Sequence, residues 1–430
     1  MRLLRFFYNL AYPVVLVAML PWLISRMIRR GKYRHKFGQR FAIYSQRVRD
    51  RLRDGGRTWV HAVSVGEVLI AMKLIRHLRT RDPLRTFVLS TTTSTGFALA
   101  GEQRSEWLEP IYNPLDFFWF TRRALNLIRP DRIVLVEAEV WPNLVCQARA
   151  RNIPIALVNA RLSPRSESRF RTFRAITAPI FNRLNVICVQ EPEDVARWQS
   201  LGVSAQRILH TGSIKFDDAS SASARDTRDF RPFLAGLGVP LAAPVLLGAS
   251  THKGEEAALG RAYKILKAEI PDLLFISVPR HVERAKEVRA DLEALGLTVV
   301  SRTQIENSKR TPDVLLVDST GELRDWYACA TVVFVGKSLL AKGGQNPAEP
   351  IVAGRATAFG PNMQNFAILV HGLLRAKGAV QIPDEAALPA ALGRLLRDAD
   401  TRAALVRNGQ SVIASHRGAT DRTCDIVAAL

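Results

Sequence analysis

At three places in this sequence, a residue whose side chain can cap a helix is followed by a glutamate three positions later. The pairs are Ser64 with Glu67, Ser319 with Glu322, and Asn346 with Glu349. This spacing is typical of a capping box, in which the glutamate closes back on the backbone amide of the capping residue. The alternative is a ligand site, because free N–H groups at a helix N-terminus attract phosphate and a glutamate there can act as a base. Spacing alone favours capping and leaves both interpretations open.

Other charged side chains follow strand-like apolar runs. Glu137 and Glu139 end one such run, and their spacing of two would place both on one face of a strand that extends so far. Arg280 ends another run, where it could hold a phosphate with two hydrogen bonds. Lys215 precedes a polar segment, where a hinge would place it at the mouth of a cleft. A capping or solvated role explains each of these residues about as well.

The sequence lacks the usual metal signatures. It contains neither HExxH nor CxxC, and its four cysteines do not stand at metal or redox spacing. One DxD triplet, at 398–400, follows a helical pattern, which favours a solvated helix end over a metal ligand. We therefore predict no metal and no cofactor. Without a metal, an enzyme that releases a phosphate group must stabilise the departing charge with arginine, lysine and helix dipoles.

The elements that would position these residues alternate between short β-branched runs and amphipathic helical patterns. Strands are predicted in the first half at 58–64, 86–93, 132–140, 154–160 and 186–190. In the second half they are predicted at 244–249, 273–278, 298–301, 314–318, 331–336 and 355–359. A polar stretch at 217–229 separates the halves. This rhythm predicts two Rossmann-like α/β domains that face a cleft, with ligands beyond the carboxyl ends of the strands.

The N-terminus carries an uncharged apolar run from Phe6 to Ser25, which a basic cluster at 26–36 follows. About 20 helical residues span the hydrocarbon core of a bilayer. We therefore predict a membrane-anchor helix within 1–30, with the rest of the chain on the cytoplasmic side. A cleaved signal peptide and a helix lying in the membrane interface are the alternatives.

The net charge of +22, from 61 basic and 39 acidic residues, requires anionic partners. An anionic lipid surface and anionic small substrates both fit this charge. Nucleic acid is a weaker candidate, because no zinc finger, basic-region heptad or aromatic RNA-binding motif is present. A composition of 47% hydrophobic and 23% charged residues is that of a folded globular protein.

Seven motifs in a fixed order resemble the 3-deoxy-D-manno-octulosonic acid (Kdo) transferases of lipid A assembly. They are HAVSVGE at 61–67, ExExWPN at 137–143, NARLS at 159–163, TGSIKF at 211–216, STHxGE at 250–255, PRH at 279–281 and NPxE at 346–349. The resemblance covers nearly the full length, including the apolar N-terminal run. It implies a GT-B fold and an inverting transfer of Kdo from CMP-Kdo to a hydroxyl of a lipid A precursor, lipid IVA, at the bacterial inner membrane.

The resemblance also implies roles for individual residues. Glu67 would be the general base, while Glu137 and Lys215 would stabilise the transition state. CMP would be held by Pro279, Arg280, Thr320, Gly321, Glu322, Asn346, Pro347, Ala348 and Glu349. The implied domains are an anchor at 1–30, an acceptor domain at 31–216, a linker at 217–240 and a CMP-sugar domain at 241–430.

Three positions depart from the family pattern. Gln345 and Asn362 stand where the family usually has histidine, and Lys337 stands where it usually has glycine. Amide side chains keep hydrogen bonding but cannot become cationic, so the departures bear on how the donor sugar is selected. The alternatives are a GT-B transferase with another nucleotide sugar, and a non-catalytic membrane-bound protein that binds lipid or nucleic acid.

Overall fold

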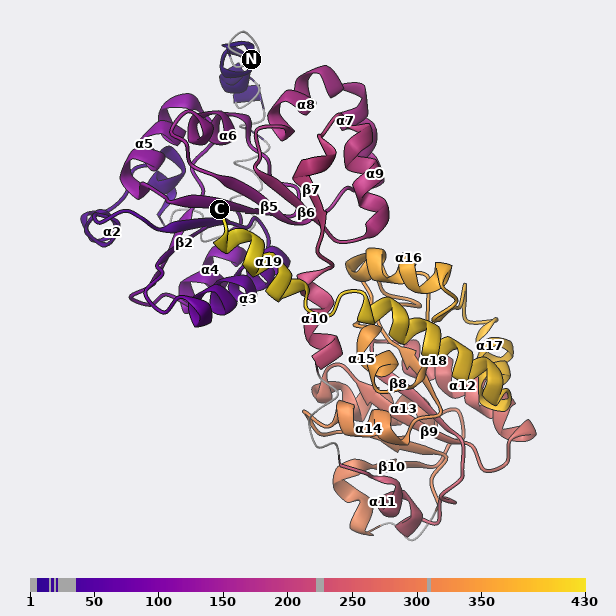
Figure 1. Ribbon diagram of the computed structural model, residues 1–430. Coiled ribbons are helices and arrows are strands. Elements are labelled where there is room, and N and C mark those ends of the chain that lie inside the picture. The colour runs from indigo at the N-terminus through magenta and orange to yellow at the C-terminus, as the bar shows by residue number, and fades with distance from the viewer. Residues whose placement is uncertain (1–5, 15–16, 19–20, 22–35, 222–227, 308–310) are drawn as a thin grey trace. The chain divides into compact units, whose positions relative to one another are not determined.

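The computed structural model of the chain describes residues 6–14, 17–18, 21, 36–221, 228–307 and 311–430 (Figure 1). The chain divides into two compact units, of which the first comprises Met1–Asp217 with Gly418–Leu430 and the second comprises Asp218–Arg417. Residues 418–430, which the sequence analysis placed in the C-terminal domain, lie with the first unit. They do so because helix α19 (Ala419–Ala428) packs against α3 (Val65–Arg81).

The first unit is built on a parallel sheet of seven strands in the order β3-β2-β1-β4-β5-β6-β7. The strands are β1 Thr58–His61, β2 Phe87–Thr91, β3 Leu108–Tyr112, β4 Arg132–Val136, β5 Ile155–Ala160, β6 Val186–Val189 and β7 Ile208–His210. Besides α3 and α19, the helices are α2 Gln46–Arg51, α4 Ser94–Glu102, α5 Phe118–Ile128, α6 Pro142–Arg149, α7 Pro164–Thr172, α8 Arg174–Phe181 and α9 Pro192–Ser200, with 3-10 turns at Phe37–Phe41 and Ala205–Arg207. Helix α10 (Ile214–Ser221) follows β7.

The second unit contains another parallel sheet of seven strands, in the order β10-β11-β9-β8-β12-β13-β14. The strands are β8 Val245–Thr251, β9 Leu274–Pro279, β10 Val299–Ser301, β11 Val314–Leu316, β12 Val332–Val335, β13 Ala356–Phe359 and β14 Val380–Gln381. The helices are α11 Arg231–Gly236, α12 Glu255–Glu269, α13 Ala285–Glu293, α14 Leu323–Cys329, α15 Ala348–Val352, α16 Ala367–Arg375, α17 Leu388–Arg397 and α18 Ala399–Ala414, with 3-10 turns at Val282–Arg284, Arg302–Asn307 and Gln364–Phe366.

Each predicted strand run overlaps one strand of the structure, so the prediction of two parallel α/β domains is confirmed. Helices cover both faces of such sheets, and their inner strands are therefore continuous apolar runs. The sequence analysis missed β3, β7 and β14. β7 and β14 are short, and all three lie at a sheet edge. β3 contains Pro110, which lacks a backbone donor and is tolerated on an edge strand.

Polar side chains of the N-terminal helical residues 6–14 form hydrogen bonds with residues of the first unit. Tyr8 donates a hydrogen bond to Asp116 at 3.0 Å, and the amides of Asn9 and Asn143 bond to each other at 3.0–3.1 Å. Across the described residues, we find no helix with enough length and apolar character to cross a bilayer. Much of the predicted anchor, including 22–30, lies outside the described residues.

Candidate functional site

Glu67 lies at the N-terminus of α3 and takes part in a complete capping box with Ser64. One carboxylate oxygen accepts hydrogen bonds from the Ser64 hydroxyl at 2.8 Å and its backbone N–H at 3.3 Å, and the other accepts from the N–H of Val63 at 2.9 Å. The capping interpretation is thus confirmed for this pair. A carboxylate has about four acceptor positions. Glu67 is buried, at 8% exposed, and the hydrogen bonds seen in the described part of the chain leave one acceptor position on Oε2 without a protein donor.

Glu137 and Glu139 follow β4, close enough to Glu67 to be affected by its charge. The strand ends at Val136 and Glu137 takes a left-handed φ of 63°, so strand alternation does not set their placement. Burial raises the pKa of Glu137, and the charge of Glu67 raises it further. Burial and then the charge of Glu67 raise the pKa of Glu139 to about 7. Near pH 7 Glu139 is therefore about half protonated, and Glu137 holds its proton to a higher pH than a solvated carboxyl would.

Lys215 and Arg161 supply positive charge beside these acids. Desolvation lowers the pKa of Lys215, while the charge of Glu137 raises it and that of Arg161 lowers it. Asn159, the next-to-last residue of β5, fixes this loop, because its side-chain oxygen accepts hydrogen bonds from the backbone of Ile214 at 3.1 Å and from the hydroxyl of Ser213 at 3.3 Å. Thus the carboxyl ends of β1, β4, β5 and β7 gather three acids and two cations.

Such a group suits the transfer of an anionic group to a hydroxyl. The open acceptor position on Glu67 can take a proton from a hydroxyl nucleophile. A protonated carboxyl and a lysine can stabilise negative charge on the group that is attacked. Burial strengthens these electrostatic interactions relative to water.

In the second unit, Glu255 ties two loops together at the start of α12. Its carboxylate is fully buried and accepts hydrogen bonds from the backbone N–H groups of His252, Lys337, Ser338 and Leu339 at 2.7–2.9 Å. The loop after β12 is thereby fixed to the end of β8. This loop leads to Asn346, so Glu255 positions one of the predicted nucleotide-binding segments.

The pair Asn346 and Glu349 does not form the predicted capping box. α15 begins at Ala348 with Pro347 as its N-cap, one position later than expected. Asn346 accepts a hydrogen bond from the N–H of Ala348 at 3.1 Å and donates one to Glu349 at 3.2 Å. Because Pro347 has no side-chain donor or acceptor, the local turn is made by the asparagine amide. Both polar side chains are half-buried.

The pair Ser319 and Glu322 also differs from a capping box. Glu322 is itself the N-cap of α14, and the Ser319 hydroxyl donates to its carboxylate at 2.5 Å. Thr320 and Gly321 between them are exposed, and Gly321 takes a φ of 89° that favours glycine. Arg302 pairs with Glu322 at 3.4 Å. This turn therefore offers exposed backbone beside a half-buried carboxylate.

The remaining predicted nucleotide-binding residues follow β9. Pro279 is buried as its last residue, and Arg280 is exposed next to it. These two, the turn at 320–322 and the segment at 346–349 follow β9, β11 and β12, so one edge of one sheet carries all nine residues. Their side chains supply one guanidinium, two carboxylates, an amide and a hydroxyl.

The three unusual residues have different surroundings. Lys337 takes a left-handed φ of 56°, which favours the glycine usual in the family, so the lysine itself has no structural explanation. Asn362 donates a hydrogen bond to the backbone oxygen of Leu339 at 3.0 Å, which a histidine nitrogen could also do. Gln345 lies with its amide nitrogen 3.2 Å from the Nε2 of His252, so it contacts the motif after β8.

Several residues of the site were not assigned from sequence. Spacing pointed to Glu139 together with Glu137 but gave it no role, and it gave no reason to select Arg161, Asn159 or Glu255, although all four stand inside the recognised motifs. The raised pKa of Glu139 marks it as a site candidate, and this shift arises from burial and from the charge of Glu67. Glu255 is marked by its hydrogen bonds from the backbone N–H groups of residues 337–339, which are 82–84 positions away in the chain. Neither property can be obtained from neighbouring residues in the chain.

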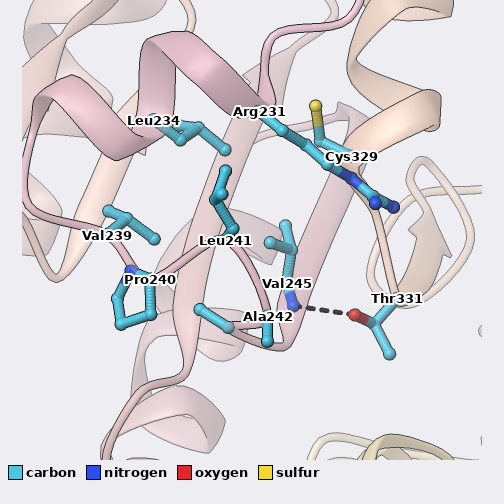
Figure 2. A pocket seen from close by; sticks show the side chains of 10 residues that line it. Arg231, Leu234, Val239, Pro240, Leu241, Ala242, Val245, Cys329 and Thr331 are labelled. Carbon is cyan, nitrogen blue, oxygen red and sulfur yellow. Dashed lines mark hydrogen bonds between the residues drawn. The ribbon is translucent and has the colours of Figure 1, made fainter.

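Figure 2 shows a separate pocket in the second unit, lined by Arg231 and Leu234 of α11, by Val245 and by Thr331. Val245 begins β8 and Thr331 immediately precedes β12, so this pocket lies at the amino ends of the strands. The Thr331 hydroxyl accepts a hydrogen bond from the N–H of Val245 at 3.0 Å. The pocket is therefore at the opposite edge of the sheet from the residues predicted to bind a nucleotide.

Comparison with known proteins gives two kinds of similarity. Residues 35–218 match the family described as 3-Deoxy-D-manno-octulosonic-acid transferase (kdotransferase). The chain is 35% identical over 382 residues to the 3-deoxy-D-manno-octulosonic acid transferase of Bordetella pertussis, covering 85% of this chain and 86% of that protein. It is 29% identical over 425 residues to the protein of the same name from Haemophilus influenzae, covering 98% of both.

Among solved structures, UDP-GlcNAc 2-epimerase from Neisseria meningitidis bound to UDP-GlcNAc aligns with a TM-score of 0.53 and 11% identity. The alignment covers 87% of this chain and 100% of that one. At this low identity the likeness concerns the fold alone.

Proposed function

Because this chain belongs to the 3-deoxy-D-manno-octulosonic acid transferase family and is a glycosyltransferase, we propose that it moves Kdo from CMP-Kdo to a hydroxyl of a lipid A precursor, lipid IVA, with inversion. The observation that carries the proposal is the group of Glu67, Glu137, Glu139, Arg161 and Lys215 at the carboxyl ends of the first sheet. It combines an oriented proton acceptor with positive charge, as direct displacement by a hydroxyl requires.

Glu67 is the proposed general base. Its capping hydrogen bonds hold the carboxylate in one orientation, and the open position on Oε2 receives the proton of the accepting hydroxyl. Capping and catalysis are therefore compatible. The fixed orientation lowers the entropy that must be lost when the acceptor hydroxyl and the base come together.

Glu137 and Lys215 are proposed to stabilise the transition state. Kdo carries a carboxylate, so the donor is doubly anionic. A protonated Glu137 donates a hydrogen bond to an anionic oxygen and avoids repulsion of it, which its raised pKa favours. Lys215 supplies a full positive charge from the neighbouring loop.

CMP is assigned to the second unit. Arg280 suits the phosphate, because a guanidinium can donate two parallel hydrogen bonds. Glu322 and Glu349 are carboxylates that can accept hydrogen bonds from ribose hydroxyls, and Asn346 offers both a donor and an acceptor.

We further propose that the protein works at the cytoplasmic face of the inner membrane. Five large apolar side chains of the N-terminal helical residues, Phe6, Phe7, Leu10, Val14 and Val17, are 56–68% exposed. An amphipathic helix of this kind lies in the membrane interface with its apolar face in the lipid. The net charge of +22 adds attraction to anionic headgroups.

The test is to incubate the full chain with CMP-Kdo and a bisphosphorylated tetraacyl disaccharide and to weigh the products by mass spectrometry. Glu67→Gln should abolish transfer, because an amide cannot accept the proton, while CMP binding by calorimetry stays unchanged. The matched control is Glu102→Gln, an exposed glutamate on α4 that should retain full activity. Full transfer by Glu67→Gln would refute the base assignment.

Other outcomes would identify the alternatives. Turnover of a different nucleotide sugar, with none of CMP-Kdo, would replace the donor assignment. Absence of CMP binding, together with nucleic-acid binding that weakens steeply with salt, would point to a non-catalytic binding protein.

A further inference from the structure

The first unit contains an apolar cavity of about 240 Å³ directly beside the proposed acids. Ala138 and Val140 line it, and they alternate along the chain with Glu137 and Glu139. Phe170 of α7 and Ile176 of α8 also line it, and these two helices follow each other directly in the first unit (Figure 1). One loop, after β4, therefore carries both the acids and part of the cavity wall.

The walls of this cavity suit a hydrocarbon. The two hydroxyl groups among the described lining residues are already hydrogen-bonded: Tyr8 donates to Asp116 at 3.0 Å, and Thr177 donates to backbone oxygens of Phe170 and Phe173 at 3.2 Å. A polar ligand would leave its own polar groups without partners there, which is unfavourable in a buried site. An apolar ligand would meet no such penalty.

The volume of the cavity and the exposed apolar residues at its border favour a hydrocarbon chain that enters from the protein surface. An apolar cavity of about 150 Å³ is large enough to bind benzene, and the present one is larger. Ile176 lines the cavity and is itself 43% exposed, and the neighbouring Phe173 is 53% exposed. The cavity is thus bordered by exposed apolar side chains.

We propose that the cavity receives one acyl chain of the lipid acceptor. The inference rests on the proposed function, since it deepens the same site. Because Ala138 and Val140 line the cavity and are chain neighbours of Glu137 and Glu139, a chain held there would bring the attached sugar headgroup close to the acids. The cavity would therefore make an acylated acceptor a better substrate than the bare disaccharide.

The variant Thr177→Phe tests the proposal by filling the cavity from α8. Its matched control is Thr172→Phe, which adds the same ring at an exposed position of α7 and removes a comparable hydroxyl contact four residues back. We expect Thr177→Phe to lower kcat/KM for the tetraacyl acceptor roughly tenfold or more. Transfer to the deacylated disaccharide should stay at the wild-type rate, and Thr172→Phe should change neither. Equal losses with both acceptors, or no loss with the acylated one, would overturn the proposal.

A second measurement uses the unaltered protein and so does not depend on how the variants fold. Soluble monoacylated acceptors of increasing chain length should bind about fourfold tighter per methylene until the cavity is full. Affinity that is independent of chain length would refute the inference. If the wild type transfers Kdo to no acceptor, the proposed function fails, and displacement of a fluorescent fatty acid by these lipids still decides whether the cavity binds an acyl chain.

Discussion

We expect Glu255→Ala to destabilise the second unit and to weaken nucleotide binding at the same time. The carboxylate of Glu255 is fully buried and accepts hydrogen bonds from four backbone N–H groups. Of the donors, Ser338 is 0% and Leu339 is 6% exposed, so neither amide could turn to water after the substitution.

The magnitude follows from these two amides. A buried donor left without a partner costs about 1–3 kcal/mol, so the pair gives a loss of about 2–6 kcal/mol in the free energy of unfolding. Glu255→Gln should lose less, because its amide oxygen still accepts some of these bonds. The control Glu293→Ala removes a half-exposed partner of Arg289 on α13, a surface pair worth about 0.5 kcal/mol.

Urea denaturation measures the stability of the full chain, and amide hydrogen exchange measures protection of residues 337–339 directly. Calorimetric titration with CMP reports the second effect, because this loop leads to Asn346. A loss below 1 kcal/mol with unchanged exchange at 337–339 would refute the reasoning. So would an unchanged CMP affinity in a variant whose loop exchanges freely.

Three further predictions concern stability. Burial raises the pKa of Asp116 from 3.8 to about 6, so between these pH values the folded state holds a proton that the unfolded state releases. The free energy of unfolding should therefore fall by about 3 kcal/mol as the pH rises from about 4 to 6. Urea denaturation of Asp116→Asn should lack this fall. Burial lowers the pKa of His61 from 6.5 to about 4, so this group has the opposite effect on stability. The free energy of unfolding should fall by about 3 kcal/mol as the pH falls from about 6.5 to 4, and His61→Gln should lack that loss. In Gly336→Ala the new methyl group would lie 2.5 Å from the backbone oxygen of Ser250, so thermal unfolding should show a loss of about 1–3 kcal/mol, whereas Gly236→Ala, with nothing within 4 Å, should be neutral or slightly stabilising.

The inner strands of both sheets could be predicted because a parallel strand covered on both faces must be apolar along its whole length. For this reason the run at 132–140 contains β4, and the run at 244–249 covers all of β8 except its last two residues. The edge strand β3 lacks such a run, since it contains Glu109 and Pro110. Burial of Glu109 depends on pairing with Arg51 and Arg104, which lie elsewhere in the chain.

Helix starts were harder to predict, because a capping pattern needs only local residues but its geometry depends on the preceding loop. Ser64 and Glu67 form the capping box that the spacing favours. Ser319 bonds to the side chain of Glu322 instead. Asn346 makes its own turn ahead of α15. The same spacing therefore gives three different local structures.

By itself the sequence determined which residue types stand at the ends of the strands, and so which chemistry each unit can offer. The βαβ rhythm requires those ends to share one edge of a sheet. Only the tertiary structure decided that Glu67 keeps an acceptor position without a protein donor, that the pKa of Glu139 rises to about 7, and that residues of their loop line an apolar cavity. These properties arise from burial and from charges more than 60 positions apart, which no local pattern records.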